Sequence, residues 1–329
     1  MMTRDEANKI IQRVDNLPLY LHAYAYHLNM RVENILPADL LDIAYEQKLT
    51  GVKIHVLDGE TRALGQLDNA ELALFRLKAE KLKLDIHIET SSSEQKYIDQ
   101  AVRIAKQVKA SSVRFYPRYE GPLKEVIAKI DADIQYIKNN YSQSGLTFTI
   151  EQHEDLKGIE LVDIVKRSDM ASLSILFDFA NMINANEEPL DALDDMKDWV
   201  TQVHIKDALI IPEGNGKGHK ACASGAGDMP FKQLLTKLIC LGDEQPQVIS
   251  YGLEEEVDYY APAFRFTGED DNPWIPWREM SETPLPTEKL AQRLAQERED
   301  ALKQIDFVRS TLQEIKRDAL LTLEQENQI

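Results

Sequence analysis

Cysteine, long apolar runs and basic residues are all scarce in this chain. Only Cys222 and Cys240 occur among the 329 residues, without CxxC spacing, which excludes a disulfide framework and favours a reducing cytoplasm. No stretch approaches the roughly 18 apolar residues that span a bilayer, and the start MMTRDEANK has no apolar segment after its basic residue. We therefore expect a cytoplasmic protein with no membrane partner, in which neither thiol takes part in function.

Acidic residues outnumber basic residues in this chain. Lys and Arg number 38 against 56 Asp and Glu, so the net charge is 38 − 56 = −18. A field of this sign repels the phosphate backbone of DNA and RNA and the surface of anionic lipids. We expect no nucleic acid among the partners.

Short runs rich in β-branched and aromatic residues recur along the chain. Between them, apolar residues stand at the three- and four-residue spacing of amphipathic helices, as in 37–49, 69–82 and 158–169. This alternation predicts an α/β fold with a single (β/α)8 barrel. The alternative, a doubly wound sheet, needs a glycine-rich turn after its first strand, and residues 17–36 contain no glycine. The eight predicted strand runs are 17–26, 50–58, 82–90, 111–118, 146–154, 173–181, 200–208 and 246–255.

Three later regions depart from the repeat. Residues 207–230 predict a glycine-rich loop that could serve as a mobile lid, and residues 257–286 are rich in proline and aromatics. From residue 287 a charged amphipathic helix is expected either to cover the barrel's own helices or to join copies in a homo-oligomer. The predicted domains are a barrel over 1–286, with its site on the carboxyl face, and a helical extension over 287–329.

The last four predicted strands each end near an ionisable residue: Glu151, Asp178, His204 and Glu254. These residues are 27, 26 and 50 positions apart, so two separations equal one repeat and the third is lengthened by the glycine-rich region. Because parallel barrel strands end at one rim, the four side chains should converge there.

Three carboxylates and an imidazole repel one another in a partly dry site unless a cation lies between them. Such ligands suit a divalent metal, with Mn²⁺ as the first expectation and Mg²⁺, Co²⁺ or Zn²⁺ as alternatives. The plainer reading is that all four are ordinary polar residues at a solvated barrel mouth. We expect the metal site.

Several motifs at these positions resemble those of the xylose isomerase-like TIM barrels, which include sugar isomerases, epimerases, sugar-acid lyases and abasic-site endonucleases. The resemblance is specific only in the second half of the chain. The motifs are IEQHED (150–155), FDFAN (177–181), VHIKD (203–207), GAGDMPF (225–231) and, more weakly, GLEEE (252–256).

The resemblance implies a metal held by Glu151, Asp178, His204 and Glu254, with a substrate carbonyl or hydroxyl completing its shell. In related epimerases the two glutamates also transfer protons, so they are the expected catalytic pair of an isomerase or epimerase working through an enediolate. Lys206 shares a strand face with His204 and is expected either to donate to a substrate oxygen or to pair with a ligand carboxylate.

Two features depart from the family pattern or leave it open. Many members carry a histidine three residues after the sixth-strand aspartate, where this chain has Asn181, which argues against the multi-zinc nucleases. The adjacent Glu255 and Glu256 make the register of the eighth-strand ligand ambiguous, since a slip of one residue reverses the face.

Polar residues on the earlier strands predict a hydrophilic ligand, because a core-filling barrel strand would keep such positions aliphatic. They include His22, Tyr24, His27 and Glu89, and Lys53 and Arg114 suit a carboxylate, which hints at a sugar acid. The WIPW segment could lay an indole over a sugar ring or form a dimer contact. The expected substrate-binding residues are His55, His87, Arg114, His153, Trp274 and Trp277.

Two other functions compete with the isomerase. A decarboxylase or lyase of a 3-oxo sugar acid would use the same metal-enolate chemistry, and the IEQHED and NPWIPW segments resemble subgroups of that kind. A barrel that binds sugar without catalysis would hold no stoichiometric metal. Under all three hypotheses the partner is a small polar sugar or sugar acid.

Overall fold

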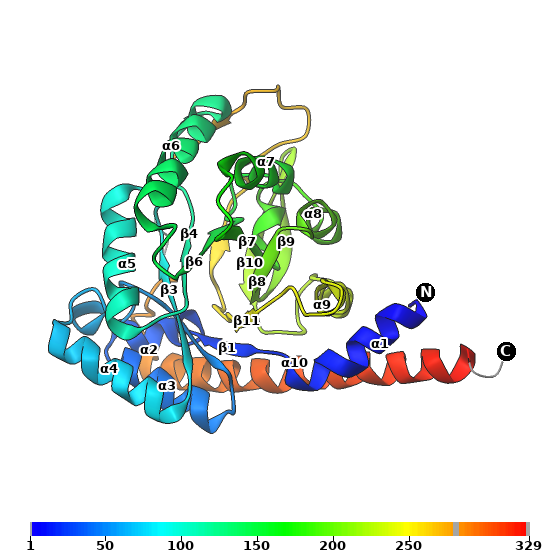
Figure 1. The fold of residues 1–329 in the computed structure, drawn as a ribbon, viewed down its shortest axis with the longest axis horizontal. Coiled ribbons are helices and arrows are strands. Elements are labelled where there is room, and N and C mark those ends of the chain that lie inside the picture. The colour runs from blue at the N-terminus through cyan, green and yellow to red at the C-terminus, as the bar shows by residue number, and fades with distance from the viewer. Residues whose placement is uncertain (1, 279–282, 327–329) are drawn as a thin grey trace.

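The computed structural model describes residues 2–278 and 283–326, and its centre is a closed barrel of eight parallel strands (Figure 1). The neighbours around the barrel are β1-β11-β8-β7-β6-β4-β3-β2, so chain order is kept and the first strand pairs with the last. Each strand lies within one of the eight predicted runs, which confirms the (β/α)8 fold. The strands are β1 (Leu19–His22), β2 (Gly51–His55), β3 (Asp85–Thr90), β4 (Ser112–Phe115), β6 (Thr147–Glu151), β7 (Leu173–Asp178), β8 (Val200–Ile205) and β11 (Ser250–Leu253).

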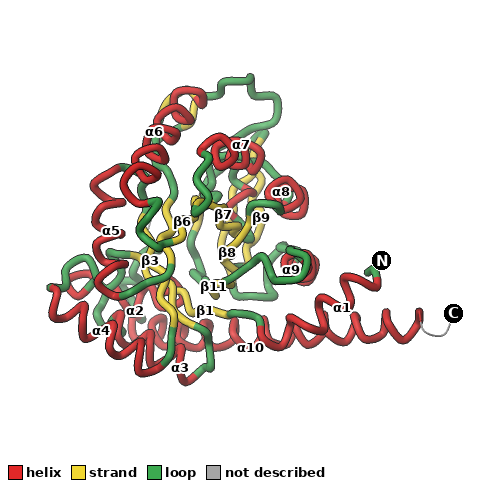
Figure 2. Tube along the Cα trace, in the orientation of Figure 1, coloured by secondary structure: helices red, strands yellow, loops and turns green. Residues whose placement is uncertain are grey.

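Helices follow the barrel strands and cover the outside of the barrel (Figure 2). Pro37 and Pro189 begin two of them, because proline fits the first helical turn, where no amide donor is needed. Asp68 caps a third by accepting from the amides of Ala70 and Glu71 at 2.8 and 2.9 Å. The helices are α3 (Pro37–Glu46), α4 (Asn69–Leu82), α5 (Gln95–Val108), α6 (Leu123–Tyr141), α7 (Gly158–Ser168), α8 (Pro189–Met196), α9 (Phe231–Cys240) and, after β11, α10 (Leu290–Glu326).

The long helix α10 packs on its own barrel. It runs beside α1 (Arg4–Arg13), a helix that the sequence reading did not predict (Figure 1). Two roles were expected for this segment, and its buried face serves the first of them, covering the barrel's own helices. Residues 327–329 of the predicted extension lie outside the described residues. Its buried core residues are Leu294, Ala301, Ile305, Val308, Leu312, Ile315 and Ala319.

One carboxylate of α10 holds the short helix α2 (His27–Arg31). Glu297 accepts from the amides of Leu28 and Asn29 at 2.6 and 2.9 Å and from the Asn29 side chain at 2.6 Å. Further along α10, Gln304 donates to the carbonyl of Ile205 at 3.0 Å, at the end of β8. The C-terminal helix therefore fixes the backbone of two segments at the carboxyl face of the barrel.

Replacing Glu297 with alanine should lower the free energy of unfolding by about 1–3 kcal/mol, because three buried donors lose their acceptor. Urea denaturation followed by circular dichroism measures the change. Glu299→Ala is the matched control on the same helix, since Glu299 is 64% exposed and its one ion pair within the described residues is with Lys303. Its effect should stay within about 0.5 kcal/mol. Equal effects of the two substitutions would contradict the clamping role of Glu297.

The glycine-rich region is an ordered hairpin rather than the loop expected from the sequence. Residues 207–222 form the antiparallel strands β9 (Asp207–Glu213) and β10 (Gly216–Cys222), and β12 (Tyr260–Ala261) joins them. A side chain at Gly216 or Gly218 would approach a backbone carbonyl to 2.7 Å, so these glycines serve close packing. The prediction of an irregular loop over residues 207–222 is wrong, because the glycines let neighbouring backbones approach one another in a hairpin.

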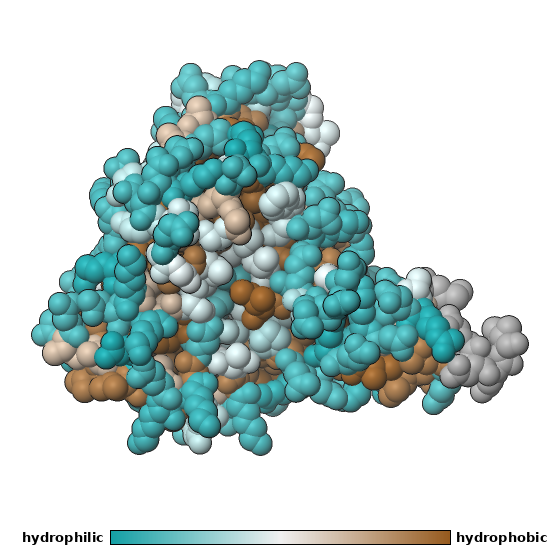
Figure 3. Space-filling view, in the orientation of Figure 1, coloured by the Kyte–Doolittle hydropathy of each residue, from teal (hydrophilic) through white to brown (hydrophobic). Residues whose placement is uncertain are grey.

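Hydrophilic side chains cover most of the face shown in Figure 3. Among the described residues, no helix combines the length and apolar content that a membrane crossing requires.

Candidate active site

The structure brings the four predicted ligands together at the carboxyl end of the barrel. Glu151 and Asp178 are the last residues of β6 and β7, His204 lies near the end of β8, and Glu254 directly follows β11. The Nδ1 atom of His204 is 3.5 Å from Glu151 Oε1 and 3.3 Å from Glu254 Oε2. All four side chains are buried, so their charges interact in a medium of low polarity.

The ring of His204 is oriented by a residue to which the sequence gave no specific role. Glu89, which is fully buried on β3, faces His204 Nε2 at 3.1 Å. This contact keeps a proton on Nε2, so Nδ1, which faces Glu151 and Glu254, is the nitrogen that a metal would bind once its own proton is lost, an arrangement typical of histidines that bind metals. The sequence feature that could have identified Glu89 as a site residue is its position two residues after His87, which puts both on the inward face of the same strand.

Asn181, the residue that departs from the family pattern, orients two of the ligands. Its backbone amide and that of Ala180 donate to Asp178 Oδ1 at 2.9 and 2.8 Å, and its side-chain amide donates to Glu151 Oε1 at 3.3 Å. These bonds occupy one oxygen of each carboxylate and leave the other available.

One atom of each predicted ligand has no hydrogen bond, and these four are the atoms that a metal would bind. Glu151 Oε2, Asp178 Oδ2, His204 Nδ1 and Glu254 Oε2 are buried without a hydrogen-bond partner in the described part of the chain. Buried polar atoms without partners are uncommon in folded proteins and call for a specific explanation.

The charge count around these atoms agrees with a divalent cation. Four buried carboxylates, which include Glu89, are in direct ion-pair contact with two buried cations, so these six charges sum to −4 + 2 = −2 when His204 is neutral. Lys206 Nζ is 3.1 Å from Asp178 Oδ2 and 3.6 Å from Glu254 Oε2, and Arg114 Nε is 3.1 Å from Glu151 Oε2. The residues present therefore fit a divalent metal in donor type and in charge.

Two overlapping groups of possible ligand atoms share His204. Glu151, Asp178 and His204 form one group within 4.8 Å, and His22, His204 and Glu254 form the other. Both ring nitrogens of His22 already have partners, because Nε2 contacts Glu89 at 2.8 Å and Nδ1 accepts from the Tyr24 amide at 3.0 Å. We therefore take Glu254, rather than His22, as the fourth ligand.

The pKa values at this centre show the cost of its uncompensated charge. Burial raises the pKa of Asp178 to about 7, even though Lys206 lowers it. Burial lowers the pKa of His204, but the carboxylates of Glu89, Glu254 and Glu151 outweigh burial and hold it well above the usual value. Both pKa shifts favour the protonated form, so the site favours the addition of positive charge.

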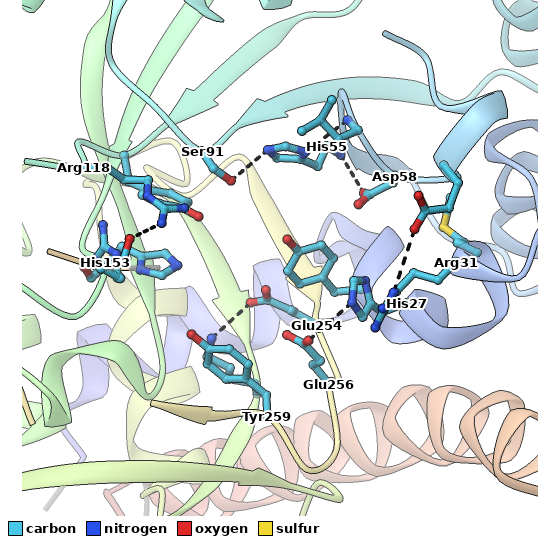
Figure 4. A pocket seen from close by; sticks show the side chains of 18 residues that line it. His27, Arg31, His55, Asp58, Ser91, Arg118, His153, Glu254, Glu256 and Tyr259 are labelled. Atoms are coloured by element: carbon cyan, nitrogen blue, oxygen red, sulfur yellow. Dashed lines mark hydrogen bonds and ion pairs between the residues drawn. The ribbon is translucent and has the colours of Figure 1, made fainter. Parts of the chain in front are cut away.

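A cavity with an empty volume of about 830 Å³, partly open to solvent, lies above the ligands (Figure 4). Glu254 and Lys206 line it directly, whereas Glu151 lies deeper and is 2% exposed. The other lining side chains come mainly from the loops that follow the strands, and those labelled in Figure 4 are His27, Arg31, His55, Asp58, Ser91, Arg118, His153, Glu256 and Tyr259.

His55 and His153 line the cavity, as predicted for substrate-binding residues. His55 Nδ1 accepts from the Leu57 amide at 3.1 Å, so its Nε2 carries the proton and donates to Ser91 at 2.8 Å. Burial lowers the pKa of His55 to about 3 and keeps the ring neutral. The ring of His153 stacks on Tyr116 with 3.8 Å between centroids.

His87 and Lys53 lie below the site, and the structure does not support a substrate contact for either. Lys53 Nζ donates to Gln202 Oε1 at 2.6 Å, and His87 Nδ1 is 3.1 Å from the same oxygen. Gly252 allows this close packing, because a Cβ there would approach Lys53 Cδ to 2.7 Å. The sequence showed that these positions face inward but not how deep they lie.

Arg114, Trp274 and Trp277 were also predicted to bind substrate, but none of them lines the cavity. Arg114 pairs with Glu89 and Glu151 beneath the cavity, so its charge supports the ligands and is not available to a substrate carboxylate. Trp274 is 60% exposed in β13 (Trp274–Ile275), which pairs with β5 (Gly121–Pro122), and it does not line the cavity. Trp277 borders an adjoining groove.

The three adjacent glutamates point in different directions. Glu254 faces His204 and Lys206, whereas Glu255 accepts from the amide and hydroxyl of Ser224 at 3.0 and 2.5 Å. Glu256 lines the outer part of the cavity, 4.0 Å from His27. This placement supports Glu254 as the eighth-strand ligand.

Glu187 supports the segment after β6, since it accepts from Gln152 at 2.8 Å and from the Gly158 amide at 2.9 Å. Burial raises the pKa of this carboxyl from 4.5 to about 7. The folded state then keeps a proton that the unfolded state releases between pH 4.5 and 7, so this group lowers stability as pH rises through that range.

Glu187→Gln keeps the acceptor and removes the titration. Relative to the wild type it should be equally stable near pH 4.5 and more stable above pH 7, by at most about 3 kcal/mol. Urea unfolding of both proteins across this pH range gives the difference. A difference that does not vary with pH would refute the assignment.

The class of protein follows from its eight-stranded parallel barrel and from the cluster of ionisable side chains at the carboxyl ends of the strands. The chain has the fold of the xylose isomerase-like TIM barrels, with four candidate ligands at the strand ends. It belongs to the family of the uncharacterized protein YihM of Escherichia coli K12, to which it is 67% identical over 97% of this chain and 98% of that protein. No model of a known protein family matches the chain.

Solved structures share the fold at low sequence identity. A D-tagatose 3-epimerase-like protein aligns with a TM-score of 0.62 and 12% identity over 92% of this chain and 99% of its own. A xylose isomerase-like protein from Mycobacterium smegmatis in complex with magnesium aligns at 0.56 and 12%, over 91% and 99%. A probable 3-DHS dehydratase, AsbF of Bacillus anthracis, aligns at 0.56 and 15%, over 72% and 92%. Neighbours of this fold therefore include sugar epimerases and a dehydratase.

Proposed function

We propose that this protein is a divalent-metal-dependent isomerase or epimerase of a sugar or sugar acid. The observation that carries the proposal is the set of four converging, buried ligand atoms on Glu151, Asp178, His204 and Glu254, which have ion-pair contacts but no hydrogen-bond partner among the described residues. A bound divalent cation supplies electrophilic polarisation of a carbonyl and its neighbouring hydroxyl. Mn²⁺ is our first choice, and the magnesium in one structural neighbour makes Mg²⁺ the next.

The side chains at the cavity floor suit proton transfer. Glu254 lines the cavity and can take a proton from a substrate carbon, and we assign the return of a proton to Glu151, which lies 3.5 Å from the same His204 Nδ1 that Glu254 approaches to 3.3 Å. Lys206 lines the same floor and can donate a hydrogen bond to a substrate oxygen. Because Glu151 lies deeper than Glu254, the pair is not equivalent in the structure.

The proposal is tested by metal analysis followed by isotope exchange. Protein purified without chelator should contain about one divalent ion per chain by elemental analysis. With that metal restored, ketohexoses and keto sugar acids in D₂O should incorporate deuterium next to the carbonyl, as seen by NMR. Protein that binds no divalent metal even when it is supplied would refute the proposal and favour a non-catalytic sugar-binding barrel.

A lyase is the second candidate, and it would act on a 3-oxo sugar acid by decarboxylation or on a related acid by loss of water. The structural similarity to a probable dehydratase is the observation that favours it. The same incubations separate these reactions, because a decarboxylase releases carbon dioxide, a dehydratase gives a product lighter by one water molecule, and an epimerase conserves every atom of the carbon skeleton and its oxygens.

The protein is further proposed to lie in the cytoplasm and to associate with copies of itself. We place the enzyme in the cytoplasm because Cys222 and Cys240 are both free thiols. Self-association is proposed through the outer face of α10, where Leu302, Leu320 and Leu321 are 41–47% exposed. The proposed partner is a small polar substrate, with neither nucleic acid nor membrane.

A further inference from the structure

A side groove adjoins the catalytic cavity above β2, β3 and β4. Its empty volume is about 1040 Å³, and it is lined among others by Tyr97, Gln100 and Trp277. Four residues line both spaces: His55, Leu57, Ser91 and Arg118. The two spaces are therefore adjacent, and these four side chains form the boundary between them.

Arg118 is the cation at this junction, in the segment after β4. Its guanidinium donates to the carbonyl of Arg278 and lies 5.6 Å from the ring of Trp277. Within the described residues it has no carboxylate within 4.0 Å. Figure 4 shows it beside Ser91 and His153, facing the cavity.

The neighbouring cations are compensated. Lys206 is 3.1 Å from an oxygen of Asp178, and Arg278 is 3.4 Å from an oxygen of Asp155. In a chain of net charge −18, an arginine that faces a cavity with no acidic partner in residues 2–278 and 283–326 is a marked exception. A guanidinium with free donors matches the geometry of a carboxylate or phosphate.

We propose that Arg118 forms an anion subsite at the junction of the cavity and the side groove, which takes a carboxylate or phosphate monoester at the end of the substrate remote from the reacting carbon. This inference rests on the proposed function for the rest of the substrate. Arg114 and Lys53, which the sequence suggested for this role, are both engaged below the cavity. Glu94 lines the groove and disfavours an anion beyond the junction.

The test compares three six-carbon polyols that differ in charge: sorbitol, gluconate and sorbitol 6-phosphate. Calorimetric titration of the full-length chain in EDTA gives each dissociation constant without metal or turnover. At least one anionic polyol should bind about tenfold more tightly than sorbitol, the size expected for one charge-assisted contact. Preference for gluconate would identify a sugar acid, and preference for the phosphate would identify a sugar phosphate.

Variants assign the preference to Arg118. Arg118→Met and Arg118→Gln should both abolish it, and the glutamine can still donate a hydrogen bond, which guards against a loss caused only by misfolding. Arg103→Met, at an exposed position of α5, is the matched control and should keep the preference. Thermal unfolding confirms that each variant is folded.

Equal binding of the three polyols by the wild type would overturn the subsite, as would a preference that survives in a folded Arg118 variant. Because these measurements need neither metal nor catalysis, their failure leaves the metal site standing. Conversely, a chain that binds the anion but no metal would disprove the proposed enzyme and retain the subsite.

Discussion

Glu254→Gln should lower catalytic efficiency by about 10³-fold and weaken binding of Mn²⁺ by at least about 100-fold. The substitution keeps the size of the side chain but removes a ligand charge 3.3 Å from His204 Nδ1 and a group that lines the cavity. Isothermal titration with Mn²⁺ measures the loss of metal binding independently of any substrate. Deuterium exchange into the preferred ketose measures the loss of catalytic efficiency.

The adjacent Glu255→Gln is the control, because Glu255 points to Ser224 and away from the ligands. Its metal affinity and turnover should stay within about twofold of the wild type, as for a change outside the site. If Glu255→Gln lost metal binding while Glu254→Gln kept it, the register at the end of β11 and the ligand set would both be wrong.

Lys206→Met should have opposite effects on the two measurements. Its ammonium group lies 3.1 Å from Asp178 Oδ2 and 3.6 Å from Glu254 Oε2, so it neutralises charge that a metal would otherwise use. Removing it changes the charge of the centre from −2 to −3 and should tighten Mn²⁺ binding by at least about tenfold. Turnover should fall by about 10²-fold or more, because the substrate loses a donor at the cavity floor.

Lys206→Arg separates charge from shape. It keeps the positive charge, so Mn²⁺ affinity should remain near that of the wild type while turnover falls because the longer, planar group misplaces the donor. Weaker Mn²⁺ binding by Lys206→Met would show that the lysine supports the metal site rather than competes for its carboxylates, and our electrostatic account would be wrong.

The early strands show where inference from sequence reached its limit. Alternation along β2 and β3 correctly indicated that Lys53, His55, His87 and Glu89 face the barrel interior. Residues two apart on one strand share a face but differ in depth by about 6–7 Å. His55 therefore reaches the cavity, while His87 lies one layer lower beside Gln202.

The terminal segments illustrate a second limit. Glycine content suggested a loop after β8, but close approach to neighbouring backbone explains Gly216 and Gly218 equally well. An amphipathic helix from residue 287 was evident from periodicity, but the partner of its apolar face was not. Packing on α1 and α2 is a contact between distant parts of the chain.

By itself, the sequence determined the barrel and the four side chains at its late strand ends. Both follow from local periodicity, because repeating β/α units close in one way and parallel strands finish at one rim. Only the tertiary structure decided which of the inward polar residues reach the cavity, that Glu89 orients His204, and that Arg118 rather than Arg114 has no acidic partner in the part of the chain that the structure describes. Depth and charge pairing depend on residues far apart in the chain, and no local pattern encodes those distances.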